Sequence, residues 1–214
     1  MQSVALIDYG SGNLRSAEKA LQRAARGLAN PCTVVTTDDP ALVAAADRVV
    51  LPGVGAFAAC MRAFDARPGL REAMTEAVRG RGAPFLGVCV GMQLLADRGL
   101  EFGETPGLGW IAGDVRRLTP DDPRCKVPHM GWNGLDLARR HAMFTGLAQG
   151  VPMYFTHSFA FYPNDAADVA AWADHGGRFP AAVARDNLAG VQFHPEKSQA
   201  AGLKLLANFL EWRP

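Results

Sequence analysis

The segment with the clearest chemical meaning is a cysteine between two glycines, Gly87-Val88-Cys89-Val90-Gly91. It follows an apolar run that begins at Pro84 and it opens a helical pattern. Such a strand-to-helix turn is typical of a nucleophile elbow, where glycines leave room for a strained residue at the tip. The start of the following helix would favour the thiolate of Cys89, and the N–H of Val90 would face an oxyanion. The alternative is a structural cysteine packed between two glycines.

A second segment, Phe193-His194-Pro195-Glu196, could supply the base that a nucleophilic cysteine needs. His194 follows an apolar run, and Pro195 would hold Glu196 in a tight turn beside the imidazole. A carboxylate in that place fixes the imidazole tautomer and compensates the charge of the imidazolium. The other histidines lack a carboxylate in so compact a turn; they are His129, His141, His157 and His175. The alternative for His194 is a purely structural histidine.

The remaining cysteines, Cys32, Cys60 and Cys125, lack flanking glycines, and we interpret them as core or surface thiols. No two cysteines have the CxxC spacing of a zinc or redox site, so all are expected to be reduced. Chemistry by cysteine and histidine requires neither a metal nor an organic cofactor, and we expect none.

The elements that must position these residues alternate in the first half of the chain, as βαβ units of a parallel sheet do. The expected strands are Val4 to Ile7, Thr33 to Thr36, Arg48 to Leu51 and Pro84 to Val88. The expected helices are Leu14 to Leu28, Pro40 to Ala46 and two pieces within Ala56 to Val78 that are separated at Pro68-Gly69.

After about Leu108 the helical spacing fades and short extended runs follow one another, which indicates an antiparallel extension. The expected strands are Gly109 to Leu118, Val151 to Phe155, Val169 to Ala173, Ala181 to Arg185 and Ala189 to Phe193, before a closing helix from Ser198 to Glu211. The sequence does not explain the role of the segment around Pro163 to Pro180. We predict one α/β domain over residues 1–214, with a flavodoxin-like, mostly parallel central sheet that is flanked by helices.

The composition argues against several classes of function. In 214 residues, 22 Lys and Arg face 21 Asp and Glu, and no basic cluster is dense enough to hold a nucleic acid. The N-terminal run from Ser3 to Asp8 lacks a basic leader, and every apolar run is shorter than the ~20 residues of a membrane span. We expect a cytoplasmic protein that binds neither nucleic acid nor membrane.

Together, Cys89, His194 and Glu196 resemble the triad of class I glutamine amidotransferases, in which a Gly-x-Cys-x-Gly elbow is completed by a distant His-Pro-Glu. Further segments resemble the glutaminase subunits of imidazole glycerol phosphate synthases, which act in histidine biosynthesis. These segments are Asp8 to Leu14, Leu51 to Phe57, Val127 to Asn133, Tyr154 to Ser158 and Gly190 to Ser198. The resemblance covers nearly the whole chain and implies an enzyme with a class I amidotransferase fold.

The resemblance also implies an oxyanion strand at Gly53, Val54 and Gly55, where glycines let a peptide N–H turn towards the oxyanion or away from it. Without the resemblance, the segment is equally well a plain turn. By the same resemblance, the substrate contacts are Gln93, Glu101, Ser158 and Phe159. Phe159 stands where we expect a tyrosine, which removes a hydroxyl. The alternative for Gln93 and Glu101 is a pair of solvated polar side chains.

The activity implied is hydrolysis of glutamine to glutamate and ammonia. An obligate partner, a (βα)8-barrel synthase subunit in a heterodimer, would use this ammonia to make imidazole glycerol phosphate and an aminoimidazole carboxamide nucleotide. The resemblance places Asn13, Trp132 and Lys197 near that interface, although Trp132 could equally be a buried anchor. The alternatives are a glutaminase subunit for pyridoxal phosphate or p-aminobenzoate synthesis, and a regulatory subunit without activity.

Overall fold

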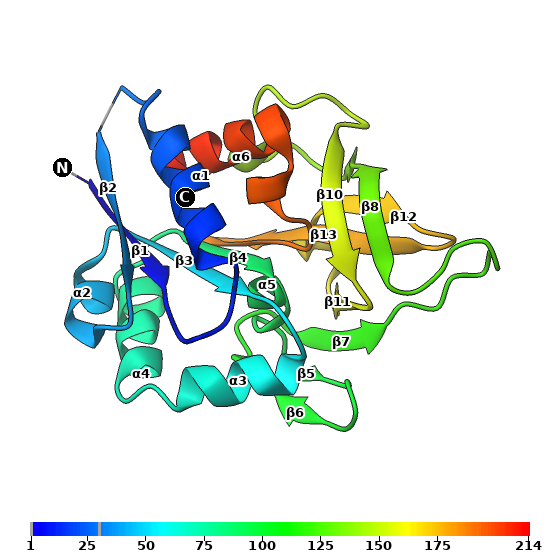
Figure 1. Ribbon diagram of the computed structural model, residues 1–214, viewed down its shortest axis with the longest axis horizontal. Coiled ribbons are helices and arrows are strands. Elements are labelled where there is room, and N and C mark those ends of the chain that lie inside the picture. Colours follow the sequence, from blue (N-terminus) through cyan, green and yellow to red (C-terminus); the bar gives the residue numbers. More distant parts are fainter. Residues whose placement is uncertain (1, 30) are drawn as a thin grey trace.

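The computed structural model describes residues 2–29 and 31–214, and at its centre lies a mixed sheet of eight strands (Figure 1). The strand order is β2-β1-β3-β4-β14-β13-β12-β9. The first five strands in this order, which end with β14, are mutually parallel and follow the flavodoxin-like order. The last three, β13, β12 and β9, continue the sheet in antiparallel pairs. The expected α/β class, with a mostly parallel sheet and an antiparallel extension, is confirmed.

Buried positions fill the parallel part of the sheet. Its strands are β1 (Gln2–Ile7), β2 (Cys32–Thr37), β3 (Arg48–Gly53), β4 (Phe85–Cys89) and β14 (Leu188–Val191). Every residue of β3, β4 and β14 is buried, because helices cover both faces of this sheet. The antiparallel strands are β13 (Arg178–Arg185), β12 (Val169–Asp174) and β9 (Asp136–Leu137).

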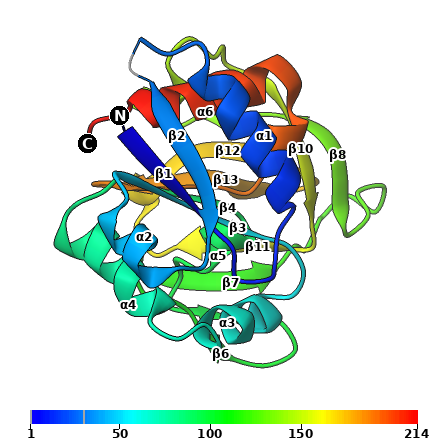
Figure 2. The ribbon, with the colours of Figure 1, turned by 60° about the vertical axis from the view of Figure 1, so that its left-hand side comes forward.

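Two groups of helices sandwich the sheet (Figures 1 and 2). One face is covered by α1 (Leu14–Ala25) and α6 (Gln199–Glu211), which pack against each other. The other face is covered by α2 (Pro40–Ala45), α3 (Phe57–Asp65) and α4 (Leu70–Thr75), and a π-helical turn at Glu76–Gly80 continues α4. The break between α3 and α4 falls at Gly69, which has φ +74°, as predicted. None of the helices in the described part of the chain has the length and apolarity to cross a membrane.

Two small sheets lie beside the antiparallel extension (Figure 1). One pairs β10 (Pro152–His157) with β8 (His129–Gly134). The other contains β11 (Phe159–Pro163), β7 (Gly113–Arg117), β5 (Arg98–Gly99) and β6 (Thr105–Pro106). Short 3-10 turns occur at Ala142–Phe144, Ala166–Asp168 and Pro195–Lys197. The strands β8 and β11 were not predicted from the sequence.

Two predicted strands are longer than those observed. The strand expected at Gly109 to Leu118 begins only at Gly113, because the N–H groups of Gly109 and Trp110 donate to carbonyls just after the elbow helix instead. The strand expected at Ala189 to Phe193 ends at Val191. Two residues beyond Gln192, the His194 N–H already donates to the carbonyl of Tyr154 in β10 at 2.8 Å, so the chain has left the central sheet there.

The segment whose role the sequence does not explain, residues 163–180, contains the end of β11, a 3-10 turn and most of a β-hairpin. The hairpin pairs β12 with β13, and its tip carries Gly176 at φ +65° and Gly177 at φ +152°. The strand predicted at Val169 to Ala173 corresponds to β12, which is one residue longer.

Candidate active site

The predicted nucleophile and base meet at one edge of the central sheet. Strand β4 lies between β3 and β14, and all three strands are parallel. In the register, Cys89 is opposite Gly53, and Val191 is opposite Val88. Because the carboxyl ends of parallel strands share an edge, Cys89, the segment after Gly53 and the segment after Val191 come together there.

Cys89 sits on a strained turn of the kind that a nucleophile elbow requires. Its backbone has φ 56° and ψ −111°, which side-chain-bearing residues rarely adopt, and α5 (Val90–Gln93) begins directly after it. A Cβ atom at Gly91 would overlap the carbonyl oxygen of Leu51, and one at Gly87 would overlap that of Gly91. Only glycines therefore fit on the two sides of the turn.

His194 and Glu196 form a buried pair. Nδ1 of His194 lies 2.9 Å from Oε1 of Glu196, and their side chains are 3% and 4% exposed. The 3-10 turn that starts at Pro195 brings them together, with Lys197 N–H donating to the His194 carbonyl at 3.0 Å. Burial alone would lower the pKa of His194, but its hydrogen bonds to Cys89 and Glu196, and their negative charges, raise that pKa to about 10. The imidazolium form is thus favoured beside the Cys89 sulfur.

A cavity of about 330 Å³ opens at Cys89 and His194. Its walls contain most of the residues that the sequence singled out for the oxyanion and the substrate: Val54, Gly55, Val90, Gln93, Glu101, Ser158 and Phe159. Gly53 is buried beneath the wall, where a Cβ atom would come within 2.8 Å of the Tyr9 hydroxyl. The cavity has the size of a small-molecule site with a few convergent polar groups.

Gln93 is buried and Glu101 is partly buried, and both side chains are hydrogen-bonded to other parts of the protein. Gln93 is 4% exposed and donates from Nε2 to the carbonyl of Phe159 at 2.9 Å and to Oε1 of Gln192 at 3.0 Å. Glu101 accepts the Phe57 N–H through Oε2 at 2.8 Å, where it also satisfies the N-terminus of α3. Its second carboxylate oxygen remains for the cavity that it lines.

The oxyanion strand expected at Gly53 to Gly55 is engaged with Ser11 in this conformation. The N–H of Val54 donates to Ser11 Oγ at 3.3 Å, and the Ser11 hydroxyl donates to the Val54 carbonyl at 2.8 Å. Behind them, the buried Cys60 thiol lies 3.4 Å from the same carbonyl. Gly55, at φ +102°, has the left-handed backbone that a rotated peptide needs.

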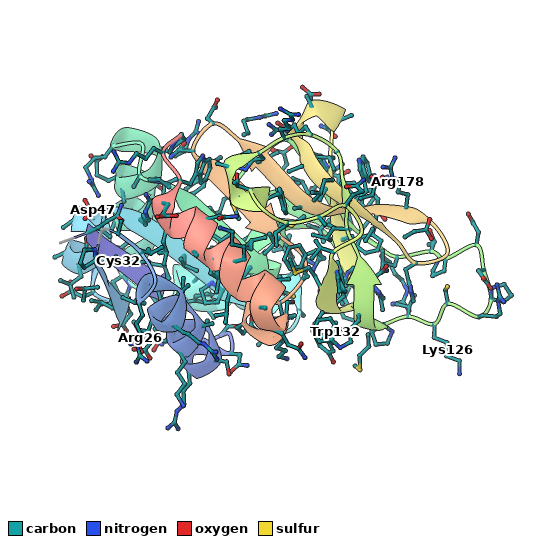
Figure 3. All side chains as sticks on the ribbon, turned by 90° about the horizontal axis from the view of Figure 1, so that it is seen from above. Arg26, Cys32, Asp47, Lys126, Trp132 and Arg178 are labelled. Carbon is teal, nitrogen blue, oxygen red and sulfur yellow. The ribbon has the colours of Figure 1, made fainter. Side chains whose placement is uncertain are left out.

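The three residues expected at a partner interface are exposed. Asn13 lines a small cavity of about 10 Å³ together with His194 and Glu196. Trp132 is 49% exposed on β8, so it is not a buried anchor, and Figure 3 shows it at the same end of the molecule as Lys126. Lys197 lines the main cavity, and its Nζ lies 5.7 Å from the centre of the Tyr154 ring, which also packs against Trp132.

Sequence reasoning missed a group of histidines behind the cavity wall. His129 stacks on His175, and its Nδ1 lies 3.0 Å from Nε2 of His157, which lines the cavity. Burial lowers the pKa of His129 to about 4 and that of His157 to about 3, so both rings are neutral. Strand β8, which carries His129, was not predicted, so the sequence offered no sign that these rings meet.

Gln192 was also missed. The signal was present in the sequence, because this amide stands within the apolar run Ala189 to Phe193. A buried amide requires hydrogen-bond partners, and here they are Gln93 and Cys89. The thiols of Cys32, Cys60, Cys89 and Cys125 are free, as expected. Over residues 2–29 and 31–214, no three His, Cys, Asp or Glu side chains are grouped so as to hold a metal ion.

The chain is similar to known proteins over its whole length. The profile of the family described as "Glutamine amidotransferase class-I" matches residues 5–212. A Caulobacter vibrioides protein described as "Imidazole glycerol phosphate synthase subunit HisH" is 66% identical over 214 residues, which cover 100% of both chains. A Rhodospirillum rubrum protein of the same description is 57% identical, with 99% of each chain covered.

Solved structures agree in fold. One chain, titled "Crystal structure of glutamine amidotransferase", superposes with a TM-score of 0.70 at 19% identity, and 97% of each chain is covered. The chain belongs to the class I glutamine amidotransferase family and, within it, to the group of imidazole glycerol phosphate synthase HisH subunits.

Proposed function

We propose that this chain is the glutaminase subunit of an imidazole glycerol phosphate synthase. It hydrolyses glutamine to glutamate and ammonia and passes the ammonia to a synthase subunit in histidine biosynthesis. The observation that carries the proposal is the buried His194–Glu196 pair beside Cys89, which stands on an elbow at the floor of a polar cavity. The full-length similarity to HisH subunits supports the particular pathway.

The first half of the reaction is attack on the side-chain amide of glutamine. The Cys89 thiolate adds to the amide carbon, and the resulting oxyanion is stabilised by the N–H of Val90 and by an N–H from the Gly53 to Gly55 strand. The His194 imidazolium then donates its proton to the leaving amine, and ammonia departs. The raised pKa of His194 suits this role, because the acid is charged before the substrate binds.

The second half releases glutamate. The γ-glutamyl thioester on Cys89 is attacked by water, from which the now neutral His194 takes a proton. Glu196 holds the His194 ring in one tautomer throughout and compensates its positive charge. No step requires a metal or an organic cofactor.

The cavity carries charges that suit an α-amino acid. Glu101 can bind the α-ammonium group of glutamine, and Ser158 can contact its main-chain groups, since both residues line the cavity. The carbonyl of Phe159 already accepts hydrogen bonds from Gln93 and His157. Because Phe159 lacks the hydroxyl of a tyrosine, Ser158 carries the only side-chain hydroxyl of these two neighbouring residues. Free glutamine is therefore the substrate class that the cavity fits.

The ammonia would be used by a second protein, since the relatives of this chain are described as subunits of a synthase. We assign this role to a (βα)8-barrel subunit that docks over Asn13, Trp132 and Lys197 to form a heterodimer. The exposure of Trp132 and the small cavity between Asn13 and His194 support this face. A biosynthetic complex of this kind works in the cytoplasm.

The proposal is tested by separating the two activities in the reconstituted complex. Cys89→Ala should abolish glutamine-dependent product formation but leave synthesis from added ammonium chloride unchanged, because the two reactions occupy different chains. Cys125→Ala is the matched control and should change neither activity. Glutamine-dependent synthesis that survives Cys89→Ala would exclude the proposed nucleophile, and failure to couple with an imidazole-forming synthase would exclude the proposed pathway.

A further inference from the structure

Gln192 is a polar side chain at the centre of the site that the mechanism above does not use. Its exposed surface is 0%. Its Nε2 points at Cys89 Sγ at 3.7 Å, and its Oε1 accepts from Gln93 Nε2 at 3.0 Å. Burying an amide costs free energy unless its polar atoms are bonded, so these two contacts determine how the side chain is held.

The orientation of the Gln192 amide follows from a chain of hydrogen bonds. The carbonyl of Phe159 can only accept, and it receives bonds from His157 Nδ1 and from Gln93 Nε2, each at 2.9 Å. Gln93 must therefore present its NH2 group, and the same group also meets Oε1 of Gln192. Turning the Gln192 amide over would set two NH2 groups against each other and an oxygen against the sulfur. The chain thus presents an N–H donor to Cys89.

We propose that Gln192 stabilises the Cys89 thiolate by donating a hydrogen bond to its sulfur, as a second partner beside His194. Cys89 is 4% exposed, so its sulfur has little contact with solvent and depends mainly on donors from the protein. Hydrogen bonds to charged groups are stronger than those between neutral groups, and an N–H facing sulfur favours the anion over the thiol. The inference deepens the proposed glutaminase function, and it rests on Cys89 being the nucleophile.

The helix after the elbow cannot fill this role alone. The sequence suggested that the helix dipole would favour the thiolate, but α5 contains only four residues, and the dipole is a sum over aligned peptides. A dedicated side-chain donor is the more effective source of stabilisation in a turn this short. This role explains why a polar residue, Gln192, stands in the apolar run before His194.

Other titratable groups also surround Cys89. His194 with Glu196 faces the sulfur directly. The charge of Cys89 also acts on Tyr9 and Cys60, behind the oxyanion strand. The cavity wall adds His157, Glu101 and Lys197. A change at Gln192 leaves each of these groups in place, so a difference between variants reports the amide.

The test is alkylation of Cys89 by iodoacetamide in the full chain, followed by peptide mass analysis over a range of pH. Gln192→Met removes the donor with little change in volume, and the half-maximal rate should move upward by about 1–2 pH units. Below that range, alkylation should slow by about 10- to 100-fold. Gln192→Leu also removes the donor and should move the profile upward to a similar extent, so it decides the question if Gln192→Met does not fold.

Asn208→Leu is the matched control. Asn208 is another buried amide, whose Nδ2 donates to the carbonyls of Met143 and Thr145, and it does not line the cavity. This variant should lower the melting temperature and leave the alkylation profile in place. Profiles that coincide in wild type and both Gln192 variants would overturn the inference, even where Cys89→Ala abolishes glutaminase activity. Activity that survives Cys89→Ala would instead remove the proposed function itself.

Discussion

The Nδ1 atom of His194 lies 2.9 Å from Oε1 of Glu196, and both side chains are almost completely shielded from water. Such a contact holds the ring so that its other nitrogen faces Cys89, and it stabilises the imidazolium. Two predictions follow from this pair, one about the carboxylate and one about the pH range of the reaction.

Glu196→Gln should lower kcat for glutamine hydrolysis by about 10²–10⁴-fold, because the charge that compensates the imidazolium is lost. The measurement is steady-state release of glutamate in the presence of the synthase partner. Glu211→Gln makes the same chemical change at an exposed position at the end of α6 and should be neutral. A Glu196→Gln enzyme within a factor of a few of wild type would contradict the triad.

The value of kcat/KM should fall as the pH rises through about 10, because this is the folded-state pKa of His194. The ordinary value is 6.5, so the pKa is raised, and the favourable interactions of the imidazolium are complete below pH 6.5 and lost above about 10. In Glu196→Gln, the decrease of kcat/KM at high pH should occur at a lower pH than in wild type. A wild-type limb close to 6.5 would show that His194 is not held as an imidazolium.

Ser11→Ala should raise the basal glutaminase rate of the isolated chain. Ser11 holds both the N–H and the carbonyl of Val54, and freeing that peptide would let the N–H turn towards the oxyanion. One oxyanion donor is worth about 10²–10³ in kcat, so the rise could reach about 10²-fold.

The control for this prediction is Ser11→Thr, which keeps the hydroxyl and should retain the low basal rate. Both variants should be compared at equal thermal stability. A basal rate that stays the same or falls in a well-folded Ser11→Ala protein would show that the Val54 peptide does not limit turnover.

The free energy of unfolding should decrease as the pH falls from about 6.5 to about 4. Burial lowers the pKa of His129 in the folded protein from 6.5 to about 4, so the unfolded ring binds a proton at a higher pH than the folded ring does. His157, with a pKa of about 3, acts in the same direction. Each histidine would contribute about 1.4 kcal/mol per pH unit within its range.

Urea unfolding of wild type and His129→Gln at neutral and acidic pH measures this effect. The variant should lose less stability on acidification, although it is less stable at neutral pH. His141→Gln is a weaker control, since burial also lowers the pKa of that ring. Equal losses in wild type and His129→Gln would contradict the assignment of a neutral His129.

The parallel half of the fold could be predicted from local patterns, because most of its strands are short apolar runs and helical patterns lie between them. The break between two helices at Pro68-Gly69 was also predicted from a local signal, because Pro and Gly interrupt helices. The second half was harder to predict, since β8 contains two glycines and exposes its hydrophobic residues Met130 and Trp132, so its pattern resembles that of a loop. Its pairing with β10 is a long-range contact that no local period reports.

The candidate site also has a part that local sequence patterns predict and a part that only the folded structure shows. The elbow around Cys89 and the turn from His194 to Glu196 are local, so residue type and spacing indicate them. The contacts of Gln192 and Ser11 join segments far apart in the chain, and only the folded structure brings these partners together. The sequence also does not reveal that the helix after Cys89, α5, ends after one turn.

The most direct measurement of the central claim is labelling by a glutamine analogue that carries a chloroketone in place of the side-chain amide. We predict one label per chain, located on Cys89 by peptide mass analysis, with protection by glutamine and no labelling of Cys89→Ala. Labelling of Cys32, Cys60 or Cys125, or labelling that glutamine does not prevent, would contradict Cys89 as the nucleophile.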